Sequence, residues 1–239
     1  MEDASAAMRG CTYFHCVLSL PDVEPPVLAW EAPAVQEVAK QLHELGDASR
    51  RRVVVAVDGR SASGKSTFAR RLGASVPGSS VVCTDDVAWW ESFFDWEHLL
   101  VEGVLEPLRR GDGVSYRPPA WDRRARSGAI EVASDASFVV IEGVGVGRRS
   151  LSEWFDAMVW VQSDLVEARR RGIERDGATP EAEAFWEEWN REEVEFLADD
   201  RPWERATLTV CGTPELTRGR HDPLSEVLVN ATTPSQQLA

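Results

Sequence analysis

The chain has 239 residues and a formal net charge of −14 at pH 7, from 40 acidic and 26 basic side chains. This acidic excess disfavours a nucleic-acid backbone or an anionic membrane surface as a partner, and the length fits one domain with an ample core. No apolar run approaches the ~18 residues of a membrane span, the start does not read as a signal peptide, and the four cysteines lack disulfide or zinc spacing. We therefore expect a cytoplasmic protein.

The first 32 residues are the least informative part of the chain. A short strand is conceivable at residues 16–20, but Pro21, Pro25 and Pro26 break any regular element after it. We expect residues 1–32 to form an N-terminal appendage without assignable chemistry. The main domain, residues 33–214, opens with apolar positions at helical spacing over residues 34–45.

The most specific motif comes after a run of buried-strand character at residues 53–57. Gly59, four further residues and then Gly64-Lys65-Ser66 match the phosphate-binding pattern G-x-x-x-x-G-K-[ST], and the apolar positions after it predict a helix. Small residues let successive amides point inward as an anion-binding nest, to which the helix N-terminus adds its dipole. The residues predicted to bind a nucleoside triphosphate are Gly59, Ser61, Ala62, Ser63, Gly64, Lys65, Ser66 and Thr67.

Two side chains of this motif have defined tasks. Lys65, one of only two lysines in the chain, is expected to reach the β- and γ-phosphates, and Ser66 is expected to bind Mg²⁺.

A second short strand at residues 80–84 ends in Asp85-Asp86. Ligands of open α/β sheets lie beyond the carboxyl ends of strands, where one carboxylate can deprotonate an acceptor hydroxyl and the other can support a metal-bound water. A helix cap or turn is the alternative interpretation of this acidic pair.

Aromatic side chains follow at residues 89–96, and Trp89 or Trp90 could stack on a planar substrate. Most of the cluster fits core packing equally well. The prolines after Arg117 exclude a central strand and lead to Trp121 and Asp122, so this segment predicts a substrate-binding flap or, alternatively, a solvated surface.

Three further buried strands are predicted at residues 138–141, 157–161 and 206–211. The first ends in Glu142, placed to join the Mg²⁺ shell, and in a glycine-containing loop at residues 143–147 that we expect to be flexible. The loop after the last strand is expected to lie near the nucleotide base.

A helix over residues 164–176 carries Arg171 and Arg175 on one face. Such arginines can neutralise a phosphoryl group in transfer, although a helix made soluble by its charges is the alternative. The following helix, residues 181–197, has an aromatic stripe suited to the core. From residue 215 to the end at residue 239 we expect a polar tail, partly disordered.

Together these motifs resemble the uridine kinase-like family of P-loop kinases, over roughly residues 52–212. The matching pieces are VDGRSASGKST, CTDDVAWW, FDWEHLLVEGVLEPLRRG, PAWD, VVIEGVGV, ARRRGIERDG and RPWERATLTVCGT. The resemblance implies a three-layer αβα P-loop NTPase fold with a parallel five-stranded sheet, a lid helix and a substrate flap. It also implies Mg²⁺ with ATP or GTP as phosphoryl donor, and Asp85 as the base.

The flap departs from the family pattern, because Trp121-Asp122 is followed by arginines and no histidine. The sequence thus predicts phosphoryl transfer to a hydroxyl of a small molecule, most simply a nucleoside or nucleoside-like compound. One alternative acceptor is a hydroxylated antibiotic. An alternative of another class is a nucleotide-binding switch or NTPase.

Overall fold

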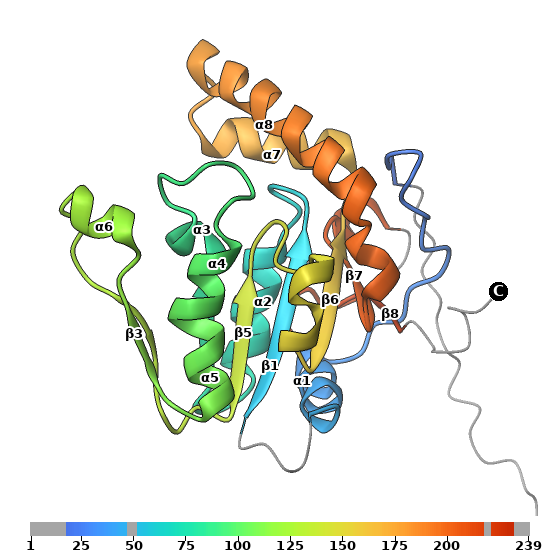
Figure 1. Cartoon of the computed structure of the whole chain (residues 1–239). Helices are drawn as coiled ribbons and strands as arrows, with labels where there is room; N and C mark the ends of the chain where they lie inside the picture. The colour runs from blue at the N-terminus through green and yellow to red at the C-terminus, as the bar shows by residue number, and fades with distance from the viewer. Residues whose placement is uncertain (1–17, 47–51, 218–220, 232–239) are drawn as a thin grey trace, which may run out of the picture.

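A computed structural model describes residues 18–46, 52–217 and 221–231 (Figure 1). Its centre is a six-stranded sheet of order β2-β5-β1-β6-β7-β8. The strands are β1 (Val53–Gly59), β2 (Ser80–Cys83), β5 (Phe138–Glu142), β6 (Ala157–Gln162), β7 (Leu208–Cys211) and β8 (Val229–Ala231). The first five in spatial order pair in parallel, which confirms the five predicted parallel strands, whereas β8 pairs antiparallel with β7.

The layers on either side of the sheet follow from the alternation of side chains along β1. Val53, Val55 and Val57 pack against α1 (Val35–Glu44) and α2 (Lys65–Ala74) on one face. Val54 and Ala56 face the opposite layer, so the strand is buried on both sides and reads as a continuous apolar run.

That opposite layer is one long helical segment with an irregular middle turn. It comprises α4 (Glu97–Leu100), the π-helical η1 (Val101–Leu105) and α5 (Glu106–Arg110). Gly103 lies in η1 directly against the ring of Tyr116, where a Cβ atom would overlap the ring. The wider turn thus accommodates a close helix–strand contact.

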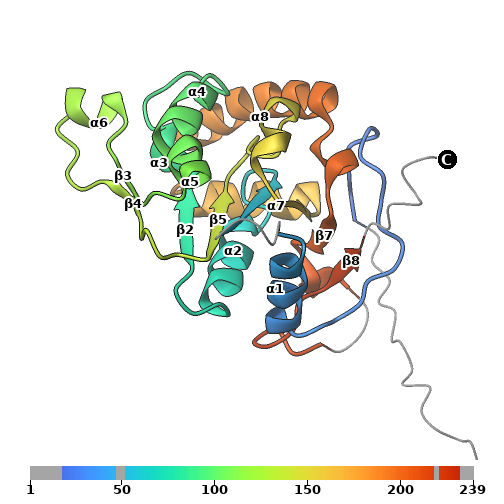
Figure 2. The same ribbon diagram turned by 60° about the horizontal axis from the view of Figure 1, so that its bottom comes forward.

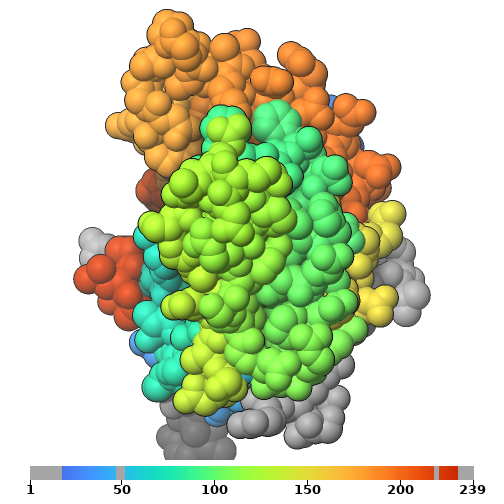
Figure 3. Space-filling model, turned by 60° about the vertical axis from the view of Figure 1, so that its left-hand side comes forward, coloured from blue at the N-terminus to red at the C-terminus, as the bar shows by residue number. Residues whose placement is uncertain are grey.

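The predicted flap is a small hairpin beside the sheet. β3 (Val114–Tyr116) and β4 (Ile130–Val132) pair antiparallel and are joined through α6 (Pro119–Arg123). Figure 3 shows this segment covering the centre of one face of the molecule. Trp121, Ile130 and Val132 belong to the same buried cluster as Val82 of β2, so the flap is packed on the domain rather than free in solvent.

Two helices cross above the carboxyl ends of the parallel strands, α7 (Leu165–Arg175) and α8 (Pro180–Asp200) (Figures 1 and 2). Asp164 caps α7 by accepting a hydrogen bond from the amide of Glu167, and Thr179 caps α8 in the same way from Ala182. These caps, with Pro180 at the first position of α8, fix where the two helices begin.

Four short helical turns complete the described elements: α3 (Thr84–Val87), η2 (Arg149–Trp154), η3 (Pro202–Arg205) and η4 (Pro214–Leu216). Across the described ranges, no helix is long and apolar enough to cross a membrane.

Both ends of the described chain pack on the sheet. The sequence predicts an appendage up to residue 32, yet Trp30 is fully buried against Cys211 and Leu228. The predicted polar tail likewise contains the strand β8, and Glu31 forms a bridge to Val229. Residues 18–20 form no strand, and the rest of the expected strand at 16–20, like the tail after residue 231, lies outside the described residues.

Candidate nucleotide and acceptor site

The phosphate-binding loop connects β1 to α2 and curls tightly. Ala62 and Gly64 both have left-handed backbone, with φ of 56° and 100°. A Cβ atom on Gly64 would lie 3.3 Å from the carbonyl oxygen of Gly212, so the loop after β7 crosses the phosphate-binding loop at close range. The strand–loop–helix context required by the motif is therefore present.

The two functional side chains of the motif lie where the helix begins. Lys65 is buried, and its Nζ lies 3.4 Å from the carbonyl oxygen of Arg60 across the loop. Ser66 Oγ donates a hydrogen bond to Glu142 Oε2 at 3.1 Å. Glu142 is itself buried, and the parallel pairing of Val57 with Glu142 brings the end of β5 beside the loop.

The Ser66–Glu142 pair fits the predicted magnesium position, because a hydroxyl and a carboxylate supply the hard oxygen ligands that Mg²⁺ prefers. In the part of the chain that the structure describes, no three His, Cys, Asp or Glu side chains form a metal cage. Mg²⁺ in P-loop proteins keeps several waters and binds phosphate oxygens, so a two-ligand protein contribution suits that mode of binding.

Asp58, which the motif does not include, organises the rear of the site. Its buried carboxylate accepts hydrogen bonds from the amides of Gly59, Gly145 and Gly147, at 2.7, 2.8 and 2.8 Å. Burial raises the pKa of Asp58 to about 6, against the lowering effect of these amides. The glycine-containing loop at 143–147 is consequently buried and tied down, and the expectation of a flexible loop is wrong.

A cavity of about 390 Å³ opens beside the end of β2. The aromatic residues that line it come from two segments, 89–96 and 185–189, and the charged residues that line it are acidic. The lining consists of Thr84, Asp85, Ala88, Trp89, Trp90, Glu91, Ser92, Phe93, Phe94, Trp96, Val144, Phe185 and Trp189. Phe93 lies edge-on to Trp189 with ring centroids 5.0 Å apart, so α8 forms one wall.

The adjacent aspartates have different surroundings. Asp85 is exposed at the cavity, and its carboxylate makes no hydrogen bond or ion pair within the described part of the chain. Asp86 instead forms an ion pair with Arg126 of the flap, and its carbonyl oxygen accepts a hydrogen bond from Trp121 Nε1 at 2.8 Å. The carboxylate of Asp86, expected near the metal, is thus engaged by the flap.

The flap residues named from the sequence hold one another. Arg117 donates to Asp122 Oδ1 at 2.8 and 2.9 Å and to backbone carbonyls of the same turn. Trp121 is only 4% exposed, with the Arg126 guanidinium 3.8 Å from its ring centroid. Of the five residues expected to bind the acceptor, Trp89 and Trp90 line the cavity. Arg117, Trp121 and Asp122 instead stabilise the flap.

Arg171 and Arg175, the two arginines of α7 expected near the phosphate, are paired within the molecule. Arg171 donates to the carbonyl oxygen of Gly212 at 2.9 Å and forms ion pairs with Glu167 and Glu215. Arg175 forms an ion pair with Asp176 at 2.8 Å, which raises the pKa of Arg175. Arg171 therefore joins α7 to the loop after β7, close to the phosphate-binding loop.

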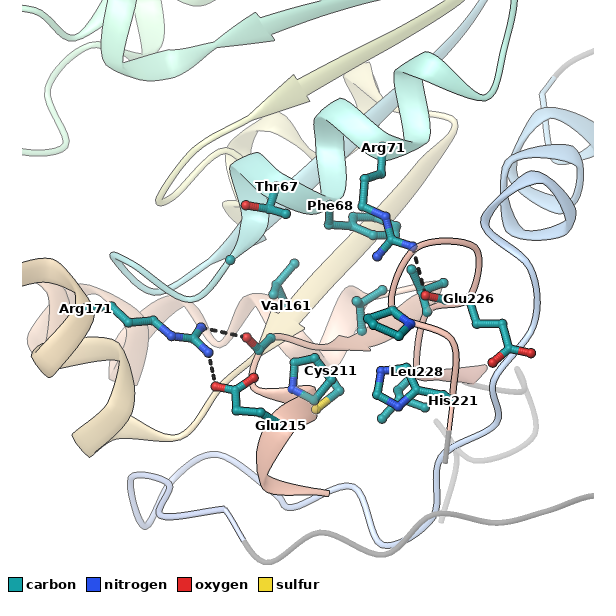
Figure 4. A pocket seen from close by; sticks show the side chains of 16 residues that line it. Thr67, Phe68, Arg71, Val161, Arg171, Cys211, Glu215, His221, Glu226 and Leu228 are labelled. Atoms are coloured by element: carbon teal, nitrogen blue, oxygen red, sulfur yellow. Dashed lines mark hydrogen bonds and ion pairs between the residues drawn. The ribbon is translucent and has the colours of Figure 1, made fainter. Parts of the chain in front are cut away.

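A second pocket, of about 280 Å³, lies between α2 and the loop after β7 (Figure 4). Thr67, Phe68 and Arg71 of α2 form one wall, and Arg171 with Glu215 closes the end nearest Gly64. Arg71 donates to the carbonyl oxygen of Glu226 at 2.9 Å, which holds the segment before β8 as the outer wall. This is the position expected for the nucleotide base.

Comparisons with known proteins support the fold. No model of a known protein family matches the sequence, and no curated protein matches it. A structure described as a possible uridine kinase from Bacillus stearothermophilus matches 73% of this chain and 96% of its own, with TM-score 0.52 and 21% identity. A Silicibacter protein, described provisionally as a fructose transport system kinase, matches 73% of this chain and 95% of its own, with TM-score 0.46 and 20% identity. This chain therefore shares the α/β fold of the structure described as a possible uridine kinase.

Proposed function

We propose that the protein is a kinase that transfers the γ-phosphoryl group of MgATP or MgGTP to a hydroxyl group of a small molecule. The observation that carries this proposal is a complete phosphate-binding loop together with an aromatic cavity lined by the exposed carboxylate of Asp85, which has no hydrogen-bond or ion-pair partner among the described residues. The fold match to a structure described as a possible uridine kinase supports it.

Each group has a task in this proposal. The backbone amides of residue 62 and residues 64–67, together with the Lys65 ammonium, bind the triphosphate, with the base in the pocket behind Gly64. Ser66 and Glu142 would hold Mg²⁺, which would supply positive charge to offset that of the triphosphate. Asp85 accepts the proton of the acceptor hydroxyl. Arg171 and Arg175, on the helix above the loop, balance charge on the moving phosphoryl group after exchanging their present partners.

The cavity lining favours a planar, uncharged or cationic acceptor. Aromatic rings cover most of the wall, and the charged lining residues are Asp85 and Glu91. Stacking stabilises flat rings. The exposed Asp85 carboxylate disfavours an anion beside it, whereas Glu91 is paired with Arg123 and the Arg124 guanidinium covers the Trp90 ring. A nucleoside or nucleoside-like compound fits best, and a hydroxylated antibiotic with an aromatic or amino group fits the same lining.

The test is release of nucleoside diphosphate from MgATP and MgGTP, with and without a pool of nucleosides and hydroxylated natural products. We expect release to depend on the pool. Lys65→Ala should lower the rate by roughly a hundredfold or more, whereas Lys40→Ala, which alters the only other lysine, an exposed one, should not change it.

Asp85→Asn should lower acceptor-dependent release by roughly 10²–10⁴-fold without weakening nucleotide binding. Asp86→Asn is its matched control, since the Asp86 carboxylate contacts the flap. Near-normal turnover of Asp85→Asn would refute the base assignment. Release at the same rate without any acceptor would favour an NTPase or switch instead.

A further inference from the structure

A carboxylate from α8 is seated directly on the phosphate-binding loop. Glu193 Oε1 accepts a hydrogen bond from the backbone amide of Ser61 at 2.7 Å. Glu193 is only 3% exposed although it lies on a helix whose other glutamates are exposed. Burial of a carboxylate is costly unless its oxygens are paired, so this contact is a specific feature of the fold.

The charge of Glu193 is balanced from inside the loop. Arg60, the second residue of the phosphate-binding motif, has its Nη1 4.0 Å from Glu193 Oε2 and is 3% exposed. Its Nε and Nη2 donate to Glu24 Oε2, both at 3.3 Å. Arg60 therefore keeps a buried carboxylate partner even when the charge of Glu193 is removed, so that change need not unfold the protein.

The same carboxylate is linked to the acceptor cavity. Trp189, one turn earlier on α8, donates from Nε1 to Glu193 Oε1 at 3.2 Å. Its indole ring lines the cavity and contacts Phe93 and Phe94, with ring centroids 5.0 and 5.4 Å apart. A chain of contacts thus runs from the cavity wall through Trp189 and Glu193 to the amide of Ser61.

We propose that Glu193 is a positioning residue, which fixes the phosphate-binding loop against α8 and, through Trp189, couples nucleotide binding to the shape of the acceptor cavity. This inference rests on the proposed function, because it assumes that a triphosphate binds the loop. Phosphate bound in the loop stabilises the positions of the Ser61 amide and Arg60 and, through their contacts with Glu193, the position of α8. The aromatic wall is then ordered for the acceptor before chemistry.

The experiment measures amide hydrogen exchange with and without Mg²⁺ and the non-hydrolysable ATP analogue AMPPNP. In the unaltered protein, we expect the analogue to slow exchange in residues 59–67 and, by roughly tenfold, in residues 185–197. Glu193→Ala should keep the protection of 59–67 and lose that of 185–197. Glu193→Gln, which retains an acceptor oxygen for Ser61, should restore most of it. Glu192→Ala, an exposed neighbour on the same helix, is the matched control.

Through the contacts of Trp189 with Phe93 and Phe94, the analogue should also slow exchange in residues 88–96 of the unaltered protein. Trp189→Phe keeps an aromatic ring but removes the indole N–H, so it should reduce this protection of 88–96 while leaving 59–67 protected. This variant and Glu193→Gln also serve if Glu193→Ala fails to fold. The inference is overturned if Glu193→Ala and Glu192→Ala give the same protection, or if the analogue protects only 59–67 in the unaltered protein. Absence of any binding of the analogue would instead refute the proposed function itself.

Discussion

Asp58 joins two loops of the site through one side chain. It precedes the phosphate-binding loop in the sequence, and its carboxylate binds the amides of Gly145 and Gly147 in the loop after β5. That second loop begins next to Glu142, the residue proposed for the magnesium shell. The position of the loop that begins beside Glu142 thus depends on Asp58, a residue outside the proposed magnesium shell.

The raised pKa of Asp58 predicts a pH dependence of stability. Its pKa is about 6 in the folded chain, against about 3.9 for an unfolded aspartate. As the pH falls from 7 to 5, the folded state therefore binds a proton before the unfolded state does, and the contribution of this group to the free energy of unfolding rises by roughly 1 kcal/mol. Asp58→Asn should lack this rise in urea denaturation. Parallel pH profiles for the two proteins would contradict the assignment.

A site residue can be located from the sequence when its type and spacing suit only one kind of site. Gly64-Lys65-Ser66 could be located because few other arrangements need that order. Arg117 and Asp122 could not be assigned by type, because an arginine and an aspartate five residues apart serve a substrate or each other equally well. The sequence gives only a weak signal for Asp58, because it shows an acidic residue at the end of a buried strand. The role of Asp58 becomes clear only from its hydrogen bonds to the glycine-containing loop after β5.

Among the elements, α7 and α8 meet at one glycine. A Cβ atom on Gly172 would overlap the indole of Trp186, which also donates from Nε1 to Asp176 at 2.8 Å. Helices α7 and α8 can therefore pack this closely only because residue 172 has no side chain.

Gly172→Ala tests this spacing against helix propensity. Alanine in a helix interior gains up to about 1 kcal/mol over glycine, yet forcing a methyl group into the Trp186 contact costs about 1–3 kcal/mol. We expect a net loss of thermal stability, measured by calorimetry. Val166→Ala, on the same helix and 70% exposed, should stay within about 0.5 kcal/mol. A higher melting temperature for Gly172→Ala would show that the two helices can separate freely.

The central strands could be predicted because they are apolar on both faces, which leaves a continuous run in the sequence. Strand β8 could not, since it has three residues and comes after a polar segment. Its place is set by the free edge of β7, a property of the assembled sheet and not of the local sequence. The burial of Trp30 depends on that same edge.

Across the whole molecule, a buried acid ties the first described segment to the site. Glu24 is 3% exposed and accepts hydrogen bonds from Trp160 Nε1 at 2.7 Å and Gln162 Nε2 at 3.1 Å, in addition to its pairing with Arg60. The described segment before α1 thus packs on the domain, whereas the sequence predicts an appendage to which no chemistry can be assigned.

Glu24→Ala should lower the free energy of unfolding by about 1–3 kcal/mol, because the buried Trp160 Nε1 loses its acceptor and Arg60 keeps only the Glu193 carboxylate, at 4.0 Å. Asp22→Ala removes an exposed acid two residues earlier and should change it by no more than about 0.5 kcal/mol. The comparison uses urea denaturation of both variants. Equal midpoints would mean that this segment contributes little to the stability of the domain.

Strands β2 and β8 are the two edges of the sheet, and the hairpin strand β4 packs beside β2 without pairing with it among the described strands. An uncovered strand edge is a template for pairing with another chain. The flap therefore shields the β2 edge, and its Arg124 and Arg126 lie over the rings of Trp90 and Trp89, which line the proposed acceptor cavity. Changes that loosen the flap to admit bulkier acceptors would uncover β2, so a broader substrate range would come with a greater tendency to aggregate.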